Sequence, residues 1–345
     1  MGRVMERILI TGATGRIGAN LVKALIEAGH TVRGFAQSDD PKIYKLKGLD
    51  VELAYGDLRD PDAVNRAVAG MSRIAHLGYI MGRPEGMTRE TEFQININGT
   101  YNVLEAARRQ PDLLACVLFA STNATYDAFH AQYVPMDESH PQNPTSFYGM
   151  AKLLGERMLE GYGREFHLPG TIVRFGTVPG PDELLGHLRA DRVAGYLRSY
   201  GTDPTATLYA KNISEPWKPI EEIINGGVNF VVPRDLHGKS WMQDLVDVRD
   251  TVDGIVRALL DKKAVGEIFN VTGPGVEWAD AVPYLAKKAN VEFRDVNIPN
   301  LWYWRCDITK AETLLGYKPK HDYRRMIDDA LAFEAGVDIG IFRAH

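Results

Sequence analysis

A glycine-rich turn near the amino terminus constrains the fold of this chain more than any other feature. The β-branched run at 7–11 predicts a strand, residues 12–18 read Gly-Ala-Thr-Gly-Arg-Ile-Gly, and a helical pattern then runs to Ala28. In such an arrangement, backbone N–H groups and the amino end of the helix receive a pyrophosphate. The first glycine permits the turn, the second lets the phosphate approach, and the third lets helix and strand pack closely. A simple tight turn is the alternative, but a second strand at 31–35 favours a dinucleotide-binding unit.

The alternation of strands and helices continues through the first half of the chain. Apolar and periodic stretches predict strands at 51–54, 73–77, 115–120 and 170–175, and helices at 61–70, 90–109 and 148–163. Elements that alternate in this way form parallel sheets covered by helices on both faces. We therefore expect an α/β fold with a Rossmann doubly wound parallel sheet.

The alternation stops near Pro181. From there to about Ser240 the chain is rich in glycine, proline and aromatic residues, which predicts an ordered cap that shapes a pocket. A helix at 248–260 and a strand at 267–271 then return to the sheet. The expected organisation is a dinucleotide-binding Rossmann domain at 1–180 with returning segments near 245–272, and a smaller, interleaved substrate-binding cap and C-terminal region at 181–345.

Composition and charge narrow the possible functions. The length of 345 residues suggests about two domains. The net charge of −5, with scattered Lys and Arg, favours neither nucleic acid nor an anionic membrane surface as a partner. No apolar run approaches the ~18 residues of a membrane span, and the histidines lack metal-ligand spacing. Cys116 and Cys306 read as free thiols of a reducing compartment, so we expect a cytoplasmic protein without a metal.

Two hydroxyls and a Tyr–Lys pair form the candidate catalytic group. Ser121 and Thr122 follow the apolar strand at 115–120, so they stand at the strand end where open α/β sheets bind ligands. Tyr148 and Lys152 are four residues apart on one helical face. A free tyrosine ionises near ~10, and a neighbouring ammonium favours the phenolate. The spacing therefore predicts a tuned proton-transfer group.

The same Tyr-x-x-x-Lys spacing occurs a second time, at Tyr284 and Lys288. No buried strand that ends in hydroxyls precedes this copy, so we interpret it as part of a surface helix. The spacing alone is therefore weak, and its context carries the prediction at Tyr148.

Several motifs occur in an order that resembles a known enzyme family. They are Thr-Gly-Ala-Thr-Gly-Arg-Ile-Gly at 11–18, Gly-Asp-Leu at 56–58, Asn-Ile-Asn-Gly-Thr at 96–100, Tyr148 with Lys152, and Asp307-x-x-Lys310 followed by Leu315-Gly316-Tyr317-x-Pro319. The set resembles the NAD-dependent epimerase/dehydratase family of extended short-chain dehydrogenases/reductases over nearly the whole chain. The resemblance implies NAD(P) as cofactor, a small C-terminal substrate domain, and a homodimer through the helices near 90–109 and 145–163.

The resemblance also implies roles for single residues. Tyr148 is the acid/base, Lys152 holds the nicotinamide ribose and lowers the tyrosine pKa, and Asn96 matches the structural asparagine of the catalytic tetrad. Thr122 is the expected catalytic hydroxyl, with Ser121 as second choice. The expected cofactor-binding residues are Gly12, Thr14, Gly15, Arg16, Ile17, Gly18, Ala36, Asp57, Leu58, Leu77, Gly78, Tyr148 and Lys152.

The implied reaction is hydride transfer at a secondary alcohol or its ketone. Asn123 and Ala124 stand where sugar-nucleotide dehydratases carry an Asp-Glu pair, so dehydration is disfavoured, whereas dehydrogenase and epimerase both stay open. Gln243 and Asn297 stand where members that use nucleotide sugars carry phosphate-binding arginines. We therefore expect a small polyol, sugar or sugar acid as substrate. The alternatives are a nucleotide-sugar 4-epimerase of the UDP-glucose/galactose type and a non-catalytic NAD(P)-binding sensor.

Cofactor choice depends on the end of the second strand. The acid that marks NAD-selective members is replaced by Ala36. No arginine follows in residues 37–40, but Arg16 and Arg33 are possible readers of a 2′-phosphate. We expect use of both cofactors with a modest lean to NADP.

Overall fold

The computed structural model describes residues 5–127 and 129–344, and a seven-stranded parallel sheet is its central element. The strand order is β3-β2-β1-β4-β5-β6-β9. The strands are β1 (Arg7–Thr11), β2 (Thr31–Ala36), β3 (Val51–Tyr55), β4 (Arg73–His76), β5 (Cys116–Thr122), β6 (Gly170–Phe175) and β9 (Ile268–Val271). The order reverses between β1 and β4, where doubly wound sheets bind ligands. The expected Rossmann α/β fold is confirmed.

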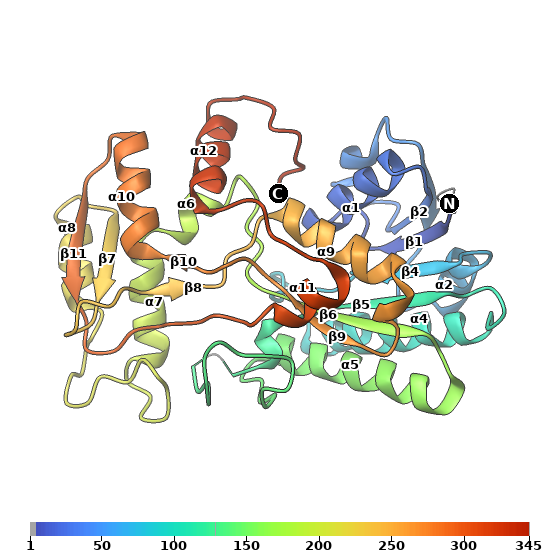
Figure 1. Ribbon diagram of the computed structural model, residues 1–345, viewed down its shortest axis with the longest axis horizontal. Helices are drawn as coiled ribbons and strands as arrows, with labels where there is room; N and C mark the ends of the chain where they lie inside the picture. The colour runs from blue at the N-terminus through green and yellow to red at the C-terminus, as the bar shows by residue number, and fades with distance from the viewer. Residues whose placement is uncertain (1–4, 128, 345) are drawn as a thin grey trace.

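Helices cover both faces of this sheet (Figure 1). The helices α1 (Arg16–Glu27) and α9 (Val248–Leu260) pack on one face, and α2 (Pro61–Val68), α4 (Gly99–Arg108) and α5 (Phe147–Phe166) pack on the other. Each layer buries its apolar face against the sheet in a separate hydrophobic core. Short helical turns connect elements at Ile43–Leu46, Asn123–Thr125 and Lys262–Ala264.

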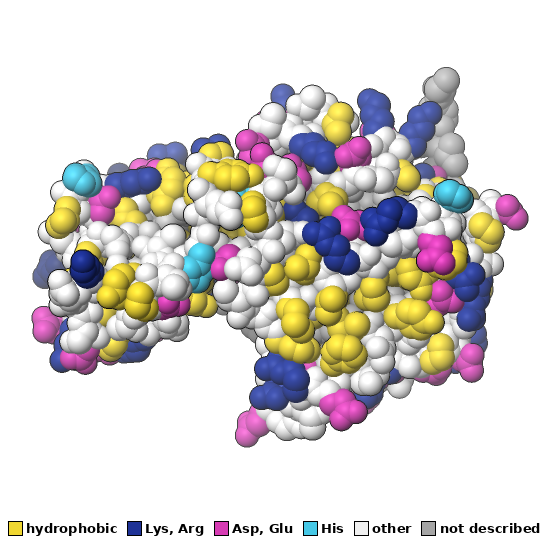
Figure 2. Space-filling view, turned by 90° about the horizontal axis from the view of Figure 1, so that it is seen from below, with side chains coloured by type: hydrophobic (Ala, Val, Ile, Leu, Met, Phe, Trp, Pro, Cys, Tyr) yellow, Lys and Arg dark blue, Asp and Glu magenta, His cyan; other side chains and the backbone are white. Residues whose placement is uncertain are grey.

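The side of the molecule formed by α4 and α5 carries exposed apolar residues. Figure 2 shows this side, with hydrophobic side chains gathered over the half that holds the large sheet. We define the apolar face as Tyr101 on α4 with Met150 and Leu154 on α5, which are 49%, 38% and 40% exposed. Single exposed apolar residues are ordinary, but a contiguous group marks an interaction surface.

Most of the remaining elements form a third hydrophobic core around Trp241 and Trp278, both fully buried. They lie to the left of the large sheet in Figure 1. The strands β7 (Phe230–Arg234) and β11 (Phe293–Asn297) pair in parallel, and β8 (Met242–Gln243) and β10 (Val276–Glu277) pair antiparallel. The helices here are α6 (Leu184–His187), α7 (Ala190–Tyr200), α8 (Lys218–Asn225), α10 (Trp278–Ala289) and α12 (Tyr323–Glu334), while α11 (Thr309–Leu315) packs near β9.

The helix expected at 90–109 is interrupted in the structure. It consists of α3 (Arg89–Phe93), a π-helical turn at Gln94–Asn98, and α4. The wider turn contains Asn96, whose amide bonds the backbone of Ile80 in the loop after β4. Single π-helical turns inside helices often occur at functional sites. Here the turn directs the side chain of Asn96, a predicted site residue, toward the Ile80 backbone.

Three further features follow from the described residues. Of the helices in this part of the chain, none combines the length and apolar character needed to cross a bilayer. Within the same residues, His, Cys, Asp and Glu side chains form no group of three that could hold a metal ion. Cys116 and Cys306 are both buried and free, as the sequence indicated.

Candidate active site

The glycine loop borders a cavity at the carboxyl ends of the parallel strands. The cavity measures about 750 Å³. Of the predicted site residues, those that line it are Gly12, Gly15, Arg16, Ile17, Gly18, Leu77, Thr122, Tyr148 and Lys152, together with the alternative Ser121. Thr14, Ala36, Asp57, Leu58, Gly78 and Asn96 are not among its lining residues.

The glycines of the loop are required by close backbone contacts. A Cβ on Gly18 would lie 2.0 Å from the carbonyl oxygen of Gly12, and Gly12 itself has a positive φ of 68°. Among the described residues, no side chain caps the amino end of α1, which begins at Arg16. Backbone N–H groups at such an end point outward and favour anions. The loop, the helix end and the adjoining cavity therefore fit the pyrophosphate of a nicotinamide dinucleotide.

Helix α5 places Tyr148 near the carboxyl ends of the strands, in the same cavity as Thr122. The Ser146 hydroxyl caps α5 by accepting a bond from the Gly149 backbone N–H at 3.0 Å. The Tyr148 ring meets Tyr79 edge to face, with centroids 6.4 Å apart. Burial raises the pKa of Tyr148 to about 12, and a hydrogen bond with Thr122 acts in the opposite direction. Tyr148 is therefore a protonated hydroxyl that can donate to an oxygen beside Thr122.

Lys152 is buried one helical turn beyond Tyr148. Its Nζ donates to the Ala120 carbonyl at 2.5 Å and lies 3.6 Å from the centroid of the Tyr79 ring. Burial lowers the pKa of Lys152 to about 7, while Glu156 raises it. The sequence suggested that this ammonium lowers the pKa of Tyr148. The structure differs, because burial dominates the tyrosine pKa and the lysine Nζ is directed to Ala120 and Tyr79.

The two candidate hydroxyls have different surroundings. Ser121 donates to Glu156, whose carboxylate forms a fully buried ion pair with Arg174 at 2.7 Å. Thr122 instead accepts a bond from the Ala124 N–H at 3.1 Å and stands beside Tyr148. The Ser121 hydroxyl is thus committed to a buried network, which supports Thr122 as the hydroxyl that meets a ligand.

Asn96 acts away from the cavity. It is fully buried, its Oδ1 accepts from the Ile80 N–H at 2.8 Å, and its Nδ2 donates to the Ile80 carbonyl at 3.1 Å. These two hydrogen bonds fix the loop after β4. The same loop also presents Tyr79 beneath Lys152. The geometry makes Asn96 a positioning residue.

The remaining predicted cofactor residues lie in or beside the loops that follow β1, β2, β3 and β4. Asp57 pairs with Arg59 at 2.7 Å and accepts from Gln37 at 3.1 Å, which holds the pKa of the Asp57 carboxyl low. Leu58 packs so closely that a Cβ on Gly78 would lie 2.9 Å from it. The Thr14 hydroxyl donates to Asp40 at 2.5 Å. Ala36, at the end of β2, is buried.

Some lining residues come from distant segments that the sequence did not single out. Glu183 pairs with Arg16 of the glycine loop at 2.6 Å, and Arg16 also donates to the Val178 carbonyl. His187 lines the same cavity, and burial lowers its pKa to about 3. Ala344 reaches the cavity because Lys42 and other residues hold the end of the chain by its backbone. No local pattern indicates these contacts, since they join segments more than 150 residues apart.

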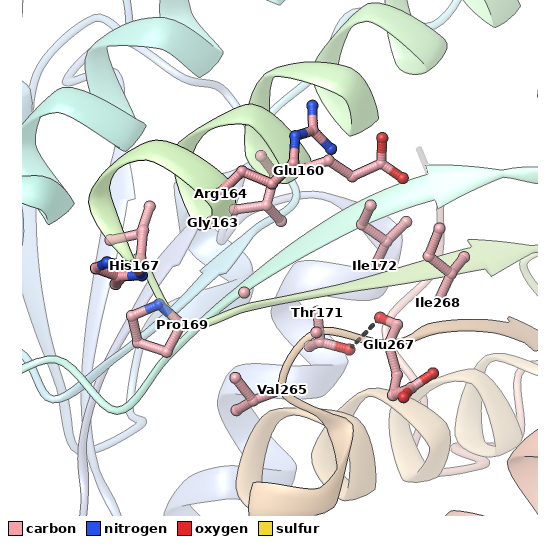
Figure 3. A pocket seen from close by; sticks show the side chains of 14 residues that line it. Glu160, Gly163, Arg164, His167, Pro169, Thr171, Ile172, Val265, Glu267 and Ile268 are labelled. Atoms are coloured by element: carbon pink, nitrogen blue, oxygen red, sulfur yellow. Dashed lines mark hydrogen bonds between the residues drawn. The ribbon is translucent and has the colours of Figure 1, made fainter.

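A second large cavity, about 550 Å³, lies at the opposite end of the sheet, where the strands begin. It is formed by the last turns of α5 and the amino ends of β6 and β9, and Figure 3 shows the Thr171 hydroxyl donating to the Glu267 carbonyl there. Ligands of open α/β sheets bind at the carboxyl ends of the strands. The cavity in Figure 3 is therefore not the candidate active site.

A family comparison agrees with this geometry. The model of the NAD dependent epimerase/dehydratase family matches residues 8–272. The matched region runs from β1 to the end of β9 and includes the glycine loop, Thr122, Tyr148 and Lys152.

Individual relatives have different names and alignment lengths. A uronate dehydrogenase from Pseudomonas syringae pv. tomato is 33% identical over 176 residues, or 50% of this chain and only 59% of that enzyme. A Bacillus subtilis (strain 168) protein named an uncharacterized UDP-glucose epimerase is 26% identical over 95% of this chain and 97% of its own length. A crystal structure of a short-chain dehydrogenase/reductase superfamily protein from Agrobacterium tumefaciens with bound NAD is 27% identical, with a TM-score of 0.76 over 96% of this chain and 99% of that one.

Proposed function

Because the chain belongs to the NAD-dependent epimerase/dehydratase family, we propose that it is an oxidoreductase in which Tyr148 assists hydride transfer at a secondary alcohol or ketone. The substrate class is a small polyol, sugar or sugar acid. The observation that carries this proposal is that one cavity joins the glycine loop to Thr122, Tyr148 and Lys152. A dinucleotide bound at the loop and a substrate beside Tyr148 would therefore share one enclosure.

Each side chain has a separate task at the substrate oxygen. The Tyr148 hydroxyl exchanges a proton with the alcohol or ketone oxygen, and Thr122 hydrogen-bonds the same atom. Lys152, held by the Ala120 carbonyl, has its amino group over the ring of Tyr79 and would hold the nicotinamide ribose. The nicotinamide ring, when bound, supplies the hydride acceptor or donor. Positioned proton transfer contributes ~10²–10⁴-fold to such rates.

Contacts near the adenosine end favour NAD over NADP. The expected lean to NADP depended on Arg16 or Arg33 as reader of a 2′-phosphate. Arg16 instead pairs with Glu183 at 2.6 Å, and Arg33 pairs with Glu52 at 2.8 Å. Asp40, which accepts from Thr14 of the glycine loop, adds negative charge close by. We therefore propose NAD as the preferred cofactor; tighter binding of NADP⁺ than NAD⁺ in a titration would contradict this.

A nucleotide-sugar 4-epimerase is the second candidate. It is favoured by the near full-length similarity to the protein named an uncharacterized UDP-glucose epimerase. An epimerase retains and recycles its cofactor, whereas a dehydrogenase exchanges it. Competition calorimetry with UDP separates the two candidates. Micromolar binding of UDP at the substrate site would support the nucleotide-sugar epimerase. The sensor alternative is disfavoured, because the family consists of enzymes and Tyr148 and Lys152 are both present in the cavity.

The direct test is a substrate panel. Purified enzyme with NAD⁺ is supplied with polyols, sugars and sugar acids, and NADH formation is followed by absorbance. Turnover with at least one member is expected. Absence of turnover across the panel, together with tight UDP binding, would overturn the dehydrogenase proposal.

A further inference from the structure

A smaller cavity adjoins the catalytic one. Its volume is about 220 Å³, and it shares Asn123, Ala124 and Thr177 with the catalytic cavity. A ligand in it is therefore next to the site of Tyr148. Sites that take drug-sized ligands occupy ~300–1,000 Å³, so this smaller cavity has room for one small ring. We call it the cap cavity.

Aromatic side chains form much of its wall. Phe129, Tyr196, Tyr200, Trp302 and Trp304 all line it. The Phe129 ring stacks on Tyr200 with centroids 3.5 Å apart and on Trp302 at 4.8 Å, so this wall is fixed. Aromatic faces carry partial negative charge. They therefore attract the polarised C–H groups of a ring that bears hydroxyls.

Four side chains of the cap cavity carry buried polar atoms that lack a well-formed hydrogen bond among the described residues, although Cys306, Thr272 and Asn123 lie close to the Asp244 carboxyl and Cys306 lies close to Trp304. These atoms are the Gln243 Oε1, both carboxylate oxygens of Asp244, and the Nε1 atoms of Trp302 and Trp304. Gln243 and Asp244 are 3% and 2% exposed. Native proteins rarely leave buried polar atoms unpaired. Since two of these residues accept and two donate, hydroxyl groups, which do both, complement them.

The charge of the cap cavity is also distinctive. Among the described lining residues, Asp244 alone can carry a full charge near neutral pH, and Lys, Arg and His are absent. Burial raises the pKa of the Asp244 carboxyl to about 7, while Cys306, Thr272 and Asn123 lower it. A buried anion without a cation is unfavourable. A carboxylate or phosphate on the ligand would therefore find no compensating cation among these lining residues.

We propose that Gln243 and Asp244 accept hydrogen bonds from substrate hydroxyls and thereby select an uncharged ring sugar or cyclic polyol over a sugar acid or nucleotide sugar. This inference rests on the proposed function and narrows its substrate class. Asp244 lies at the border of the two cavities, since a Cβ on Gly176 would meet its Oδ2 at 3.2 Å. It is thus placed to orient the ring relative to Tyr148.

The test compares matched substrates and matched variants. The substrates are an aldose and the uronic acid with the same ring hydroxyls, for example galactose and galacturonate, assayed with NAD⁺. The variants are Asp244→Asn and Asp112→Asn, which remove the same charge. Asp112 is exposed and lies between α4 and β5. Wild type is expected to favour the neutral sugar at least tenfold in kcat/KM.

Asp244→Asn is expected to raise KM for the neutral sugar about tenfold and to reduce the ratio of kcat/KM between the neutral sugar and the uronic acid, with NAD⁺ affinity unchanged. Asp112→Asn should match wild type in KM, in this ratio and in NAD⁺ affinity. A wild-type preference for the uronic acid overturns the inference while leaving the proposed oxidoreductase function intact, and so does an unchanged substrate ratio in Asp244→Asn.

Two further measurements complete the test. If Asp244→Asn does not fold, Gln243→Leu replaces it with the same expectation for KM. If wild type turns over nothing, calorimetry of the NAD⁺-loaded enzyme with neutral sugars decides separately. Binding that Asp244→Asn weakens upholds the inference although the proposed reaction fails. Absence of binding rejects both.

Discussion

At the scale of single residues, Tyr148 has the most direct consequence for activity. Its hydroxyl stands beside Thr122 in the catalytic cavity, whereas the proposed pyrophosphate site is the glycine loop. Tyr148→Phe is therefore expected to lower kcat by ~10²–10⁴-fold and to leave NAD⁺ binding nearly unchanged. Steady-state kinetics and a fluorescence titration measure the two effects.

The chain contains its own control for this substitution. Tyr284 and Lys288 repeat the spacing on α10, but both contact Asp328, at 2.8 and 2.9 Å, away from the cavity. Tyr284→Phe should keep the wild-type kcat. Wild-type turnover in Tyr148→Phe, or an equal loss in Tyr284→Phe, would remove Tyr148 from the mechanism.

His76 gives a pH dependence of stability. It is buried at the end of β4, between the hydroxyls of Thr11 at 2.7 Å and Thr100 at 3.0 Å. Burial, and secondarily Lys152, lowers its pKa from 6.5 to about 3. Between these values the unfolded chain binds the proton and the folded chain does not, so the stability from this residue falls as the pH falls from 6.5 toward 3.

The expected slope is at most ~1.4 kcal/mol per pH unit in the free energy of unfolding. His76→Asn should be less stable than wild type at pH 7 and show a shallower loss on acidification. Urea unfolding at several pH values, compared between the two proteins, isolates the histidine. Parallel curves would show that His76 is charged, or exposed, in the folded protein.

At the scale of elements, sequence periodicity was sufficient to predict a strand or helix where the apolar pattern covers the whole element. The strands β1 to β6 and α9 follow apolar runs or helical periods of ordinary length. The strands β8 and β10 have two residues each, and β7 pairs with β11 about 60 residues away. Such elements exist because tertiary contacts stabilise them, so local propensity could not reveal them.

The candidate site divides in the same way. Helix spacing predicted that Tyr148 and Lys152 share one face, the strand end indicated Ser121 or Thr122, and the family resemblance implied Thr122. The engagement of Ser121 with Glu156, and of Arg16 with Glu183, depends on how separate segments pack. The same is true of the buried polar atoms of Gln243 and Asp244. The sequence marked position 243 only as lacking an arginine.

The packing of α5 on the sheet leads to a further expectation. A Cβ on Gly155 would lie 2.3 Å from Cζ of Phe119 in β5, so alanine there forces either the buried Phe119 ring or α5 to shift. Gly155→Ala is expected to cost ~1–3 kcal/mol in stability and to lower kcat, because α5 carries Tyr148. A thermal melt and the kinetic assay measure both.

Gly163→Ala on the same helix is the matched control. Its Cβ would meet only the Leu168 carbonyl, at an ordinary 3.6 Å. Replacing a helical glycine with alanine stabilises by about 0.5–1 kcal/mol, so this variant should melt at or above the wild-type temperature with wild-type kcat. Equal melting temperatures for the two variants would show that Gly155 does not set the spacing.

At the scale of the whole molecule, the apolar face on α4 and α5 bears on assembly. Tyr101 on α4 and Met150 and Leu154 on α5 are substantially exposed. The π-helical turn that leads into α4 carries Asn96, and α5 carries Tyr148. Burying the apolar face against a second copy would remove it from water and hold both active-site helices in place.

We therefore expect a homodimer through α4 and α5. A stable interface buries roughly 1,200–2,000 Å² in total, and a charge at its centre would be desolvated without a partner. Leu154→Arg should thus convert the protein to a monomer in sedimentation velocity at micromolar concentration. Leu236→Arg, at an 81% exposed position between β7 and β8, is the control and should stay dimeric. A monomeric wild type, or a dimeric Leu154→Arg, would contradict assembly through this face.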